Sequence, residues 1–216
     1  MHTVNHMKQF FPALLLIGLT AATSVQAADD AQGKTLFEST CVACHGTAGQ
    51  GNPALGAPAL AGQQAAYLQR QLMNFRSGLR GTAVGDTGGV QMTAMAKGLP
   101  DDAAVTAVAD YLASLPAVAA PANVAGGDAA QGAKLYQSKC GSCHGGKAEG
   151  NPAFSAPALA GQSDSYLKTQ FENFKQGKRG YEQADRYGRQ MKMMANTLND
   201  AEFLDVLAYL NTLGSR

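Results

Sequence analysis

Apolar residues recur every three or four positions in two stretches, one near residue 105 and the other near residue 205. The two stretches consist of Val105, Val108, Ala109 and Leu112, and of Phe203, Leu207, Leu210 and Leu213. This spacing places apolar side chains on one face of an α-helix. Asp101 or Asp102 before the first stretch, and Asp200 before the second, suit a helix N-terminus. We therefore predict one amphipathic helix at each place.

Four more helices are predicted from similar signals. Two begin with an acidic residue, which favours a helix N-terminus, and span residues 29–40 and 128–139. The other two span residues 64–77 and 163–176 and end at Gly78 and Gly177, a residue type common just after a helix. Alternating runs of β-branched residues, which are typical of strands, do not occur. The predicted fold class is all-α.

The predicted helices form two sets because the sequence repeats itself. A shift of 99 residues lays the segment 51–81 on the segment 150–180, and 19 of the 31 positions are identical. A two-copy repeat of this length predicts two compact domains rather than a solenoid, whose units are shorter and more numerous. We place the domains at residues 28–115 and 128–216, with a linker at 116–127 that is low in charge and contains proline and glycine.

Residues 1–27 have the pattern of a secretory signal peptide. A short polar start with Lys8 precedes an apolar stretch from Phe10 to Val25, and small residues lead to a predicted cleavage point after Ala27. The apolar stretch is short for a membrane span, although retention of the leader as an anchor stays open. No later segment approaches a transmembrane run, so we expect a mature protein that is soluble outside the cytoplasm.

The net charge of the chain gives little information about its binding partners. Residues 28–216 contain 16 basic and 16 acidic side chains, so no positive excess favours nucleic acid. The halves differ, because residues 28–120 carry 5 basic and 7 acidic side chains (net −2) while residues 121–216 carry 11 and 9 (net +2). Such a dipole could orient the molecule on a charged partner, and an ordinary solvated surface explains the counts equally well.

The chain contains two copies of the motif Cys-X-X-Cys-His, which are its clearest candidates for cofactor binding. They consist of Cys41, Cys44 and His45, and of Cys140, Cys143 and His144. This pattern attaches a c-type haem, because the two thiols form thioethers with the haem vinyl groups and the histidine binds the iron. A redox disulfide or a single zinc site also uses paired cysteines, but neither requires a histidine directly after the second one. We predict two covalently bound haem c groups, each containing iron.

The sixth iron ligand can be narrowed by elimination. Outside the leader and the two motifs the chain has no histidine or cysteine, which leaves methionine, lysine, tyrosine or an open position. Two methionine pairs coincide when the halves are overlaid: Met92 with Met191, and Met95 with Met194. Met92 and Met191 are each followed by a leucine seven positions later, and we prefer them as axial ligands. The second pair is the alternative, with a competing role as flexible filler beside the porphyrin.

Other repeated residues are candidates for supporting roles. Pro58 and Pro157 each follow the motif histidine by 13 positions, and a backbone carbonyl there could accept the Nδ1 hydrogen of that histidine. A rigid turn is the alternative role of each proline. Three further pairs are candidates for contact with the haem propionates or with the opposite domain: Tyr67 and Tyr166, Asn74 and Asn173, and Arg80 and Arg179. The alternative is that they are ordinary residues of the core edge and the surface.

Together these motifs resemble the cytochrome c4 family over essentially the whole mature chain. Each half has the haem motif, a Pro-Ala-Leu-Ala-Gly-Gln segment, an Asn-Phe-X-X-Gly-X-Arg-Gly stretch, and a methionine before a closing helix that contains Tyr-Leu. The resemblance implies two tandem class I cytochrome c domains packed about a pseudo-twofold axis, with the haem propionate edges facing one another. It also implies that histidine and methionine bind both irons.

The same resemblance implies a function. Members of this family carry electrons in the periplasm, commonly toward a terminal oxidase, so we expect an electron carrier and not an enzyme. The expected donor is a quinol–cytochrome c reductase or a dehydrogenase, and the expected acceptor is an oxidase. The alternative is an electron-accepting subunit of a periplasmic dehydrogenase, such as a flavocytochrome sulfide dehydrogenase. We further expect a monomer without a nucleic-acid partner, and peripheral association with the membrane stays open.

Overall fold

The computed structural model describes residues 22–119 and 126–214, and the regular structure of this part is helical. In the first half the helices are α1 (Ala22–Thr40), α2 (Val42–His45), η1 (Pro53–Leu55), α3 (Ala65–Ser77), α4 (Thr87–Lys97) and α5 (Asp102–Ser114). In the second half they are α6 (Ala129–Lys139), α7 (Gly141–His144), η2 (Pro152–Phe154), α8 (Asp164–Lys175), α9 (Arg186–Ala195) and α10 (Asp200–Thr212). Extended pairing within the described residues is limited to two isolated bridges. The all-α prediction is confirmed.

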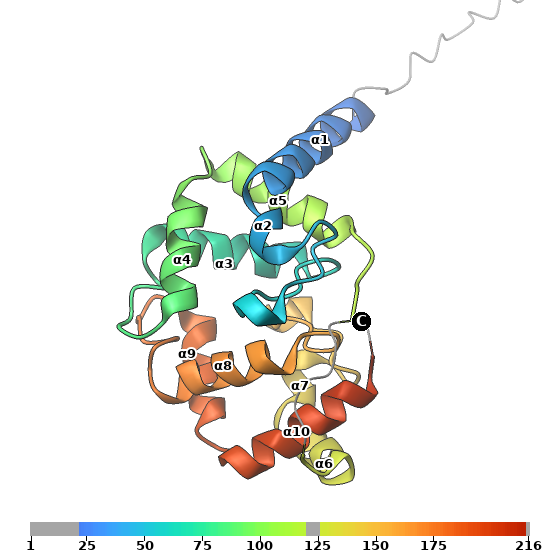
Figure 1. Ribbon diagram of the computed structural model, residues 1–216, viewed down its shortest axis with the longest axis vertical. Coiled ribbons are helices and arrows are strands. Elements are labelled where there is room, and N and C mark those ends of the chain that lie inside the picture. Colours follow the sequence, from blue (N-terminus) through green and yellow to red (C-terminus); the bar gives the residue numbers. More distant parts are fainter. Residues whose placement is uncertain (1–21, 120–125, 215–216) are drawn as a thin grey trace, which may run out of the picture.

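The first and last helices of each half pack against each other, α1 on α5 and α6 on α10 (Figure 1). A glycine lies at each contact. A Cβ atom added to Gly33 would collide with the carbonyl of Ala107, and one added to Gly132 would collide with the carbonyl of Asp205. The missing side chain therefore allows the two backbones to approach closely, and this fixes how the helix pair packs.

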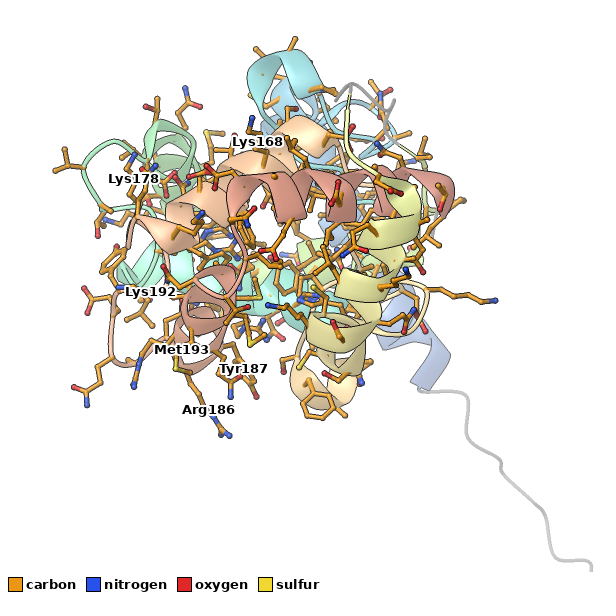
Figure 2. All side chains as sticks on the ribbon, turned by 90° about the horizontal axis from the view of Figure 1, so that it is seen from below. Lys168, Lys178, Arg186, Tyr187, Lys192 and Met193 are labelled. Atoms are coloured by element: carbon orange, nitrogen blue, oxygen red, sulfur yellow. The ribbon has the colours of Figure 1, made fainter. Side chains whose placement is uncertain are left out.

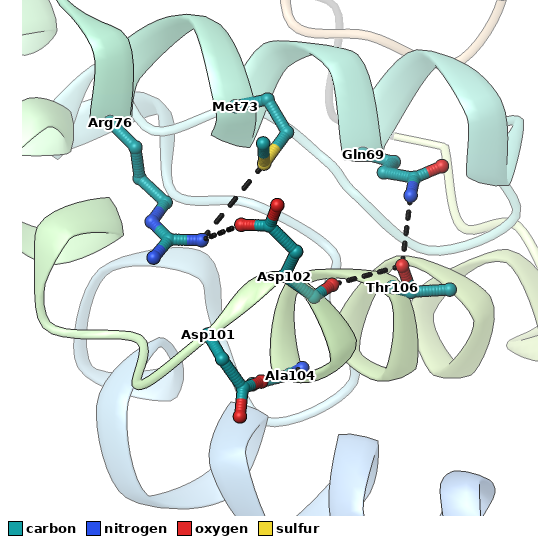
Figure 3. Close-up of polar contacts among 7 residues, drawn as sticks. All are labelled: Gln69, Met73, Arg76, Asp101, Asp102, Ala104 and Thr106. Atoms are coloured by element: carbon teal, nitrogen blue, oxygen red, sulfur yellow. Dashed lines mark hydrogen bonds and ion pairs between the residues drawn. The ribbon is translucent and has the colours of Figure 1, made fainter.

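Polar contacts join α3 to α5 in the first half (Figure 3). Arg76 Nη1 donates to Asp102 Oδ1 at 2.7 Å, and Gln69 Nε2 donates to Thr106 Oγ1 at 2.8 Å. Asp101 caps α5, since its Oδ1 accepts the backbone N–H three residues later at 2.8 Å. Of the two predicted caps for this helix, Asp101 is the one used.

Two features of the helices differ from the sequence prediction. The first helix was expected to begin at Asp29, but α1 begins at Ala22 and runs through the predicted cleavage point after Ala27. Helices α4 and α9 were not predicted. Each is started by a buried aspartate, Asp86 or Asp185, whose Oδ1 accepts a backbone N–H at 3.0 Å from the glycine three residues later. Glycines in the first turn of both helices weaken the sequence signal for them.

Parts of two predicted segments lie outside the described residues. They are residues 1–21 of the leader and residues 120–125 of the linker. The proposed domain limits therefore stay predictions. No helix in the described ranges combines the length and the apolar character needed to cross a membrane.

The two halves face each other through reciprocal hydrogen bonds. Gln63 Nε2 donates to the carbonyl of Ala158 at 3.0 Å, and the N–H of Ala158 donates to Gln63 Oε1 at 2.9 Å. Gln162 makes the same pair of bonds with Ala59, whose N–H donates to Gln162 Oε1 at 3.0 Å. The shift of 99 residues converts one set of contacts into the other. The tandem domains therefore pack with pseudo-twofold symmetry, as expected.

Candidate haem-binding sites

The two Cys-X-X-Cys-His motifs fold into the short helices α2 and α7. The first cysteine of each motif precedes the helix, and the histidine ends it. All four thiols are free; Cys44 and Cys143 are exposed, whereas Cys41 and Cys140 are half-buried. Burial raises the pKa of Cys41 and Cys140 to about 11, so both are protonated thiols at neutral pH. The cysteines are therefore available for thioether bonds rather than paired as disulfides.

The zinc alternative has no geometric support. Within the ranges that the structure describes, no group of three or more histidine, cysteine, aspartate or glutamate side chains gathers as a metal site requires. The two cysteine pairs lie in separate halves of the molecule and not around one common centre (Figure 1). Each motif forms a site of its own.

Both motif histidines are buried and fixed by a backbone carbonyl. His45 Nδ1 lies 3.0 Å from the carbonyl oxygen of Pro58, and His144 Nδ1 lies 2.8 Å from that of Pro157. A carbonyl only accepts, so Nδ1 carries the hydrogen and Nε2 keeps the lone pair that an iron ligand needs. Burial lowers the pKa of both histidines, which keeps the rings neutral.

The candidate methionines lie on α4 and α9. Met92 and Met191 are half-buried, and Met191 packs against the core of the second half. Met95 and Met194 are more exposed, at 43% and 39% of their surface. The less exposed pair is thus the one that we preferred from the sequence. A thioether that binds a buried iron must face inward, so this difference supports that choice.

A symmetric polar cluster lies between the halves. The Nη1 and Nη2 atoms of Arg80 donate to Gln71 Oε1 at 2.7 Å and to Gln170 Oε1 at 2.9 Å. Arg179 donates to the same two oxygens, each at 3.0 Å. Arg179 also donates to the hydroxyl of Tyr67 in the other half at 3.1 Å. The arginine and tyrosine pairs singled out in the sequence thus meet the opposite domain.

This cluster holds two positive charges that form no ion pair in the described ranges, although Asp185 lies near enough to Arg179 to interact with it. Arg80 and Arg179 are 6% and 7% exposed, and neither belongs to an ion pair among the described residues. Arg80 Nε is buried and has no hydrogen-bond partner in this part of the chain. Buried cations require compensating negative charge. Carboxylates of a porphyrin would add to the charge of Asp185, so the residues present fit a haem in each half.

Comparison with known proteins places these features in a family. The family model described as Cytochrome c matches the chain twice, over residues 31–116 and 129–214. The chain belongs to the cytochrome c family. This cytochrome carries two covalently bound haem c groups, one for each Cys-X-X-Cys-His motif.

The cytochrome is similar to cytochrome c4 proteins and to an electron acceptor of thiosulfate dehydrogenase. It is 30% identical to cytochrome c4 of Azotobacter vinelandii, over 95% of this chain and 99% of that one. A solved structure of cytochrome c4 from Acidithiobacillus ferrooxidans has a TM-score of 0.65 at 30% identity, covering 81% of this chain and 99% of that chain. A thiosulfate dehydrogenase electron acceptor of Thiomonas intermedia is 40% identical over 65% of this chain and 64% of its own length. The cytochrome is therefore cytochrome c4-like.

Sequence reasoning missed several residues of these sites. The four interface glutamines, Gln63, Gln71, Gln162 and Gln170, are identical under the shift of 99 residues, so the repeat contained a signal for them. Arg70 carried no such signal, because its counterpart is Thr169. Its contacts become visible only when the two halves are assembled.

Proposed function

We propose that this cytochrome is a periplasmic, monomeric electron carrier in which protein residues bind both axial positions of each haem iron. The observation that carries the proposal is the repeated geometry of one buried, neutral histidine and one half-buried methionine in each half. With both axial positions filled, neither iron has a site for substrate. Electron transfer through a haem edge is then favoured over bond-making chemistry.

The proposed ligands are His45 with Met92 and His144 with Met191. When bound, each haem supplies reversible one-electron chemistry at its iron. The carbonyls of Pro58 and Pro157 hold the rings in the tautomer that directs Nε2 to the metal. A methionine thioether as the second ligand raises the reduction potential, which suits a respiratory carrier.

Arg80 and Arg179 are proposed to pair with the haem propionates. Both guanidiniums lie at the interface and are shared by Gln71 and Gln170, one from each half. Guanidinium groups bind carboxylates with paired, directional hydrogen bonds. This arrangement would bring the propionate edges of the two haems together, so that electrons can pass between the halves.

The partners are proposed by analogy with the relatives. Its similarity to cytochrome c4 supports delivery of electrons from a quinol–cytochrome c reductase or a dehydrogenase toward a terminal oxidase. Similarity to a thiosulfate dehydrogenase electron acceptor supports the second candidate, an acceptor for one particular dehydrogenase. The two candidates differ in how tightly the donor is held.

Purification from native periplasm and membranes tests the two functions. A free carrier is expected to elute as a monomer, to be reduced and reoxidised by two electrons, and to show no turnover of thiosulfate or peroxide by itself. A catalytic chain that stays bound through salt washing would favour the dehydrogenase acceptor. Peroxide turnover together with a high-spin haem would contradict both candidates.

A further inference from the structure

One contact between the halves breaks their symmetry. Arg70 extends from α3 into the second half, where its Nη2 donates to the carbonyl of Ser155 at 2.7 Å. Its guanidinium carbon also lies 4.5 Å from the ring centroid of Tyr187 and 5.3 Å from that of Tyr67. The position equivalent to Arg70 in the second half is Thr169, which is too short to make the reverse contact.

The two groups of the second half that Arg70 contacts lie on the segments that carry the proposed ligands of the second haem. Ser155 precedes Pro157 by two residues, and the carbonyl of Pro157 fixes His144. Tyr187 precedes Met191 by four residues on α9, and residues spaced by four share one face of a helix. A single side chain of the first half therefore contacts both segments that carry the proposed ligands of the second haem.

At the symmetric position, the segments that carry the proposed ligands of the first haem border an open cavity. The counterparts of Ser155 and Tyr187 are Gly56 and Gly88, and a Cβ atom at either glycine would meet no atom within 4 Å. A cavity of about 360 Å³ is lined by both glycines together with Thr169. Both glycines and Thr169 are exposed, so water can enter this cavity.

Arg70 brings a charge as well as bulk. Burial lowers its pKa, but a guanidinium remains protonated at neutral pH. Its Nε is buried without a hydrogen-bond partner in the described part of the chain. Asp185 lies near enough to interact with this charge. A positive charge in a poorly solvated place acts strongly on a nearby ion.

We propose that Arg70 is a positioning residue that makes the two haems inequivalent, closing the second haem site and giving that haem the higher reduction potential. A nearby positive charge and the exclusion of water both disfavour the more positive, oxidised iron. The first haem, beside the open cavity, is better solvated and has the lower potential. This proposal rests on the proposed electron-transfer function and assigns a direction to it, from the first haem to the second.

The Arg70→Thr variant of the haem-loaded protein, which copies Thr169, tests the proposal. Redox titration is expected to show a lower potential for the second haem and an unchanged first haem, with the haems assigned by NMR of their methyl groups. The equilibrium constant for transfer from the first haem to the second should fall about tenfold, the size expected for one partly buried charge near the iron. The Arg76→Thr variant removes the same charge from α3 away from the interface and should leave both potentials unchanged.

The reverse transplant gives an independent measurement. A Gly88→Tyr, Thr169→Arg double variant supplies the missing contact to the first haem site and is expected to raise the potential of the first haem. Unchanged potentials in both sets of variants, or equal shifts of both haems, would overturn the proposal. The iron–sulfur charge-transfer band distinguishes failure of this proposal from failure of the proposed ligand set. If the ligand set is wrong, the wild-type protein lacks the band. If only the role of Arg70 is wrong, all samples retain it.

Discussion

The duplication supplies an internal control for each proposed iron ligand. Replacing Met92 by alanine is expected to abolish the iron–sulfur charge-transfer band of the first haem only, and replacing Met191 that of the second only. Each variant should retain about half of the wild-type band, because the two sites lie in separate cores. Absorption spectra of the oxidised proteins measure this directly.

Met95 and Met194 provide matched controls one helical turn away. Alanine at either position is expected to leave the full band, since both side chains are more exposed than those of Met92 and Met191. If the band is lost in the Met95 and Met194 variants and kept in the Met92 and Met191 variants, then Met95 and Met194 are the iron ligands.

The buried histidines also predict how stability depends on pH. Their pKa is lowered in the folded protein below the ordinary value of 6.5, so the unfolded chain binds more protons below that pH. The free energy of unfolding should therefore fall as pH decreases from about 6.5, by up to about 1.4 kcal/mol per histidine for each pH unit. Iron coordination, which needs a neutral ring, acts in the same direction.

Guanidinium unfolding of the mature haem protein between pH 7.5 and 5.5 measures this dependence. His45 and His144 are the only histidines after residue 27, so no other imidazole titrates in this range. A midpoint that stays constant from pH 7.5 to 5.5 would show that the histidines do not contribute.

Sequence reasoning succeeded best with residues whose role depends on local spacing. The haem motifs are contiguous, and the distance of 13 residues from each histidine to a proline was enough to suggest the carbonyl contact seen at Pro58 and Pro157. Arg70 shows the limit of that approach. Its partners are 85 and 117 positions away, and only the assembled interface brings them together.

Helices α5 and α10, which have a regular apolar stripe, were predicted, whereas α4 and α9, which have glycine in the first turn, were not. Helices α5 and α10 bury the expected faces, including Val105, Leu112 and Leu207. Helices α4 and α9 form because a buried aspartate caps each one and because they pack on α3 and α8. Tertiary packing of this kind outweighs local propensity.

The crossing of α6 and α10 gives a prediction about these elements. Gly132→Ala would force the added methyl group into the backbone of Asp205. We expect a loss of about 1–3 kcal/mol in the free energy of unfolding, as for other overpacked cores. Denaturant titration of the haem-loaded protein checks this.

Gly146→Ala is the matched control in the same half. Gly146 is exposed, and a Cβ atom there would meet nothing within 4 Å. Its stability should change by less than about 0.5 kcal/mol. Equal effects of the two substitutions would argue against a close contact at Gly132.

Across the whole molecule, basic side chains collect on the second half. Arg186, Arg189 and Lys192 are spaced by three along α9, near Met193, which is 65% exposed. Figure 2 shows Arg186, Tyr187 and Met193 projecting together from this end of the molecule. The equivalent positions on α4 are Thr87, Val90 and Thr93, all uncharged. An acidic redox partner should therefore dock beside α9.

Stopped-flow electron transfer with an acidic redox protein tests this docking prediction. An Arg186→Gln, Arg189→Gln variant is expected to lower the second-order rate constant about tenfold at low ionic strength, and high salt should remove the difference. A Lys34→Gln, Lys134→Gln variant loses the same charge from α1 and α6. A rate that falls equally in both variants would indicate a general charge effect and not a docking site.

The reciprocal bonds of Gln63 with Ala158 and of Gln162 with Ala59 have an evolutionary consequence. A contact in which each partner offers the same residues is the form that a single-domain homodimer makes with itself. Fusion of two such copies would start from surfaces that already matched. In a homodimer every substitution occurs in both copies. After fusion, a substitution such as arginine at position 70 can occur in one copy alone, and the other copy can keep a different residue at the equivalent position.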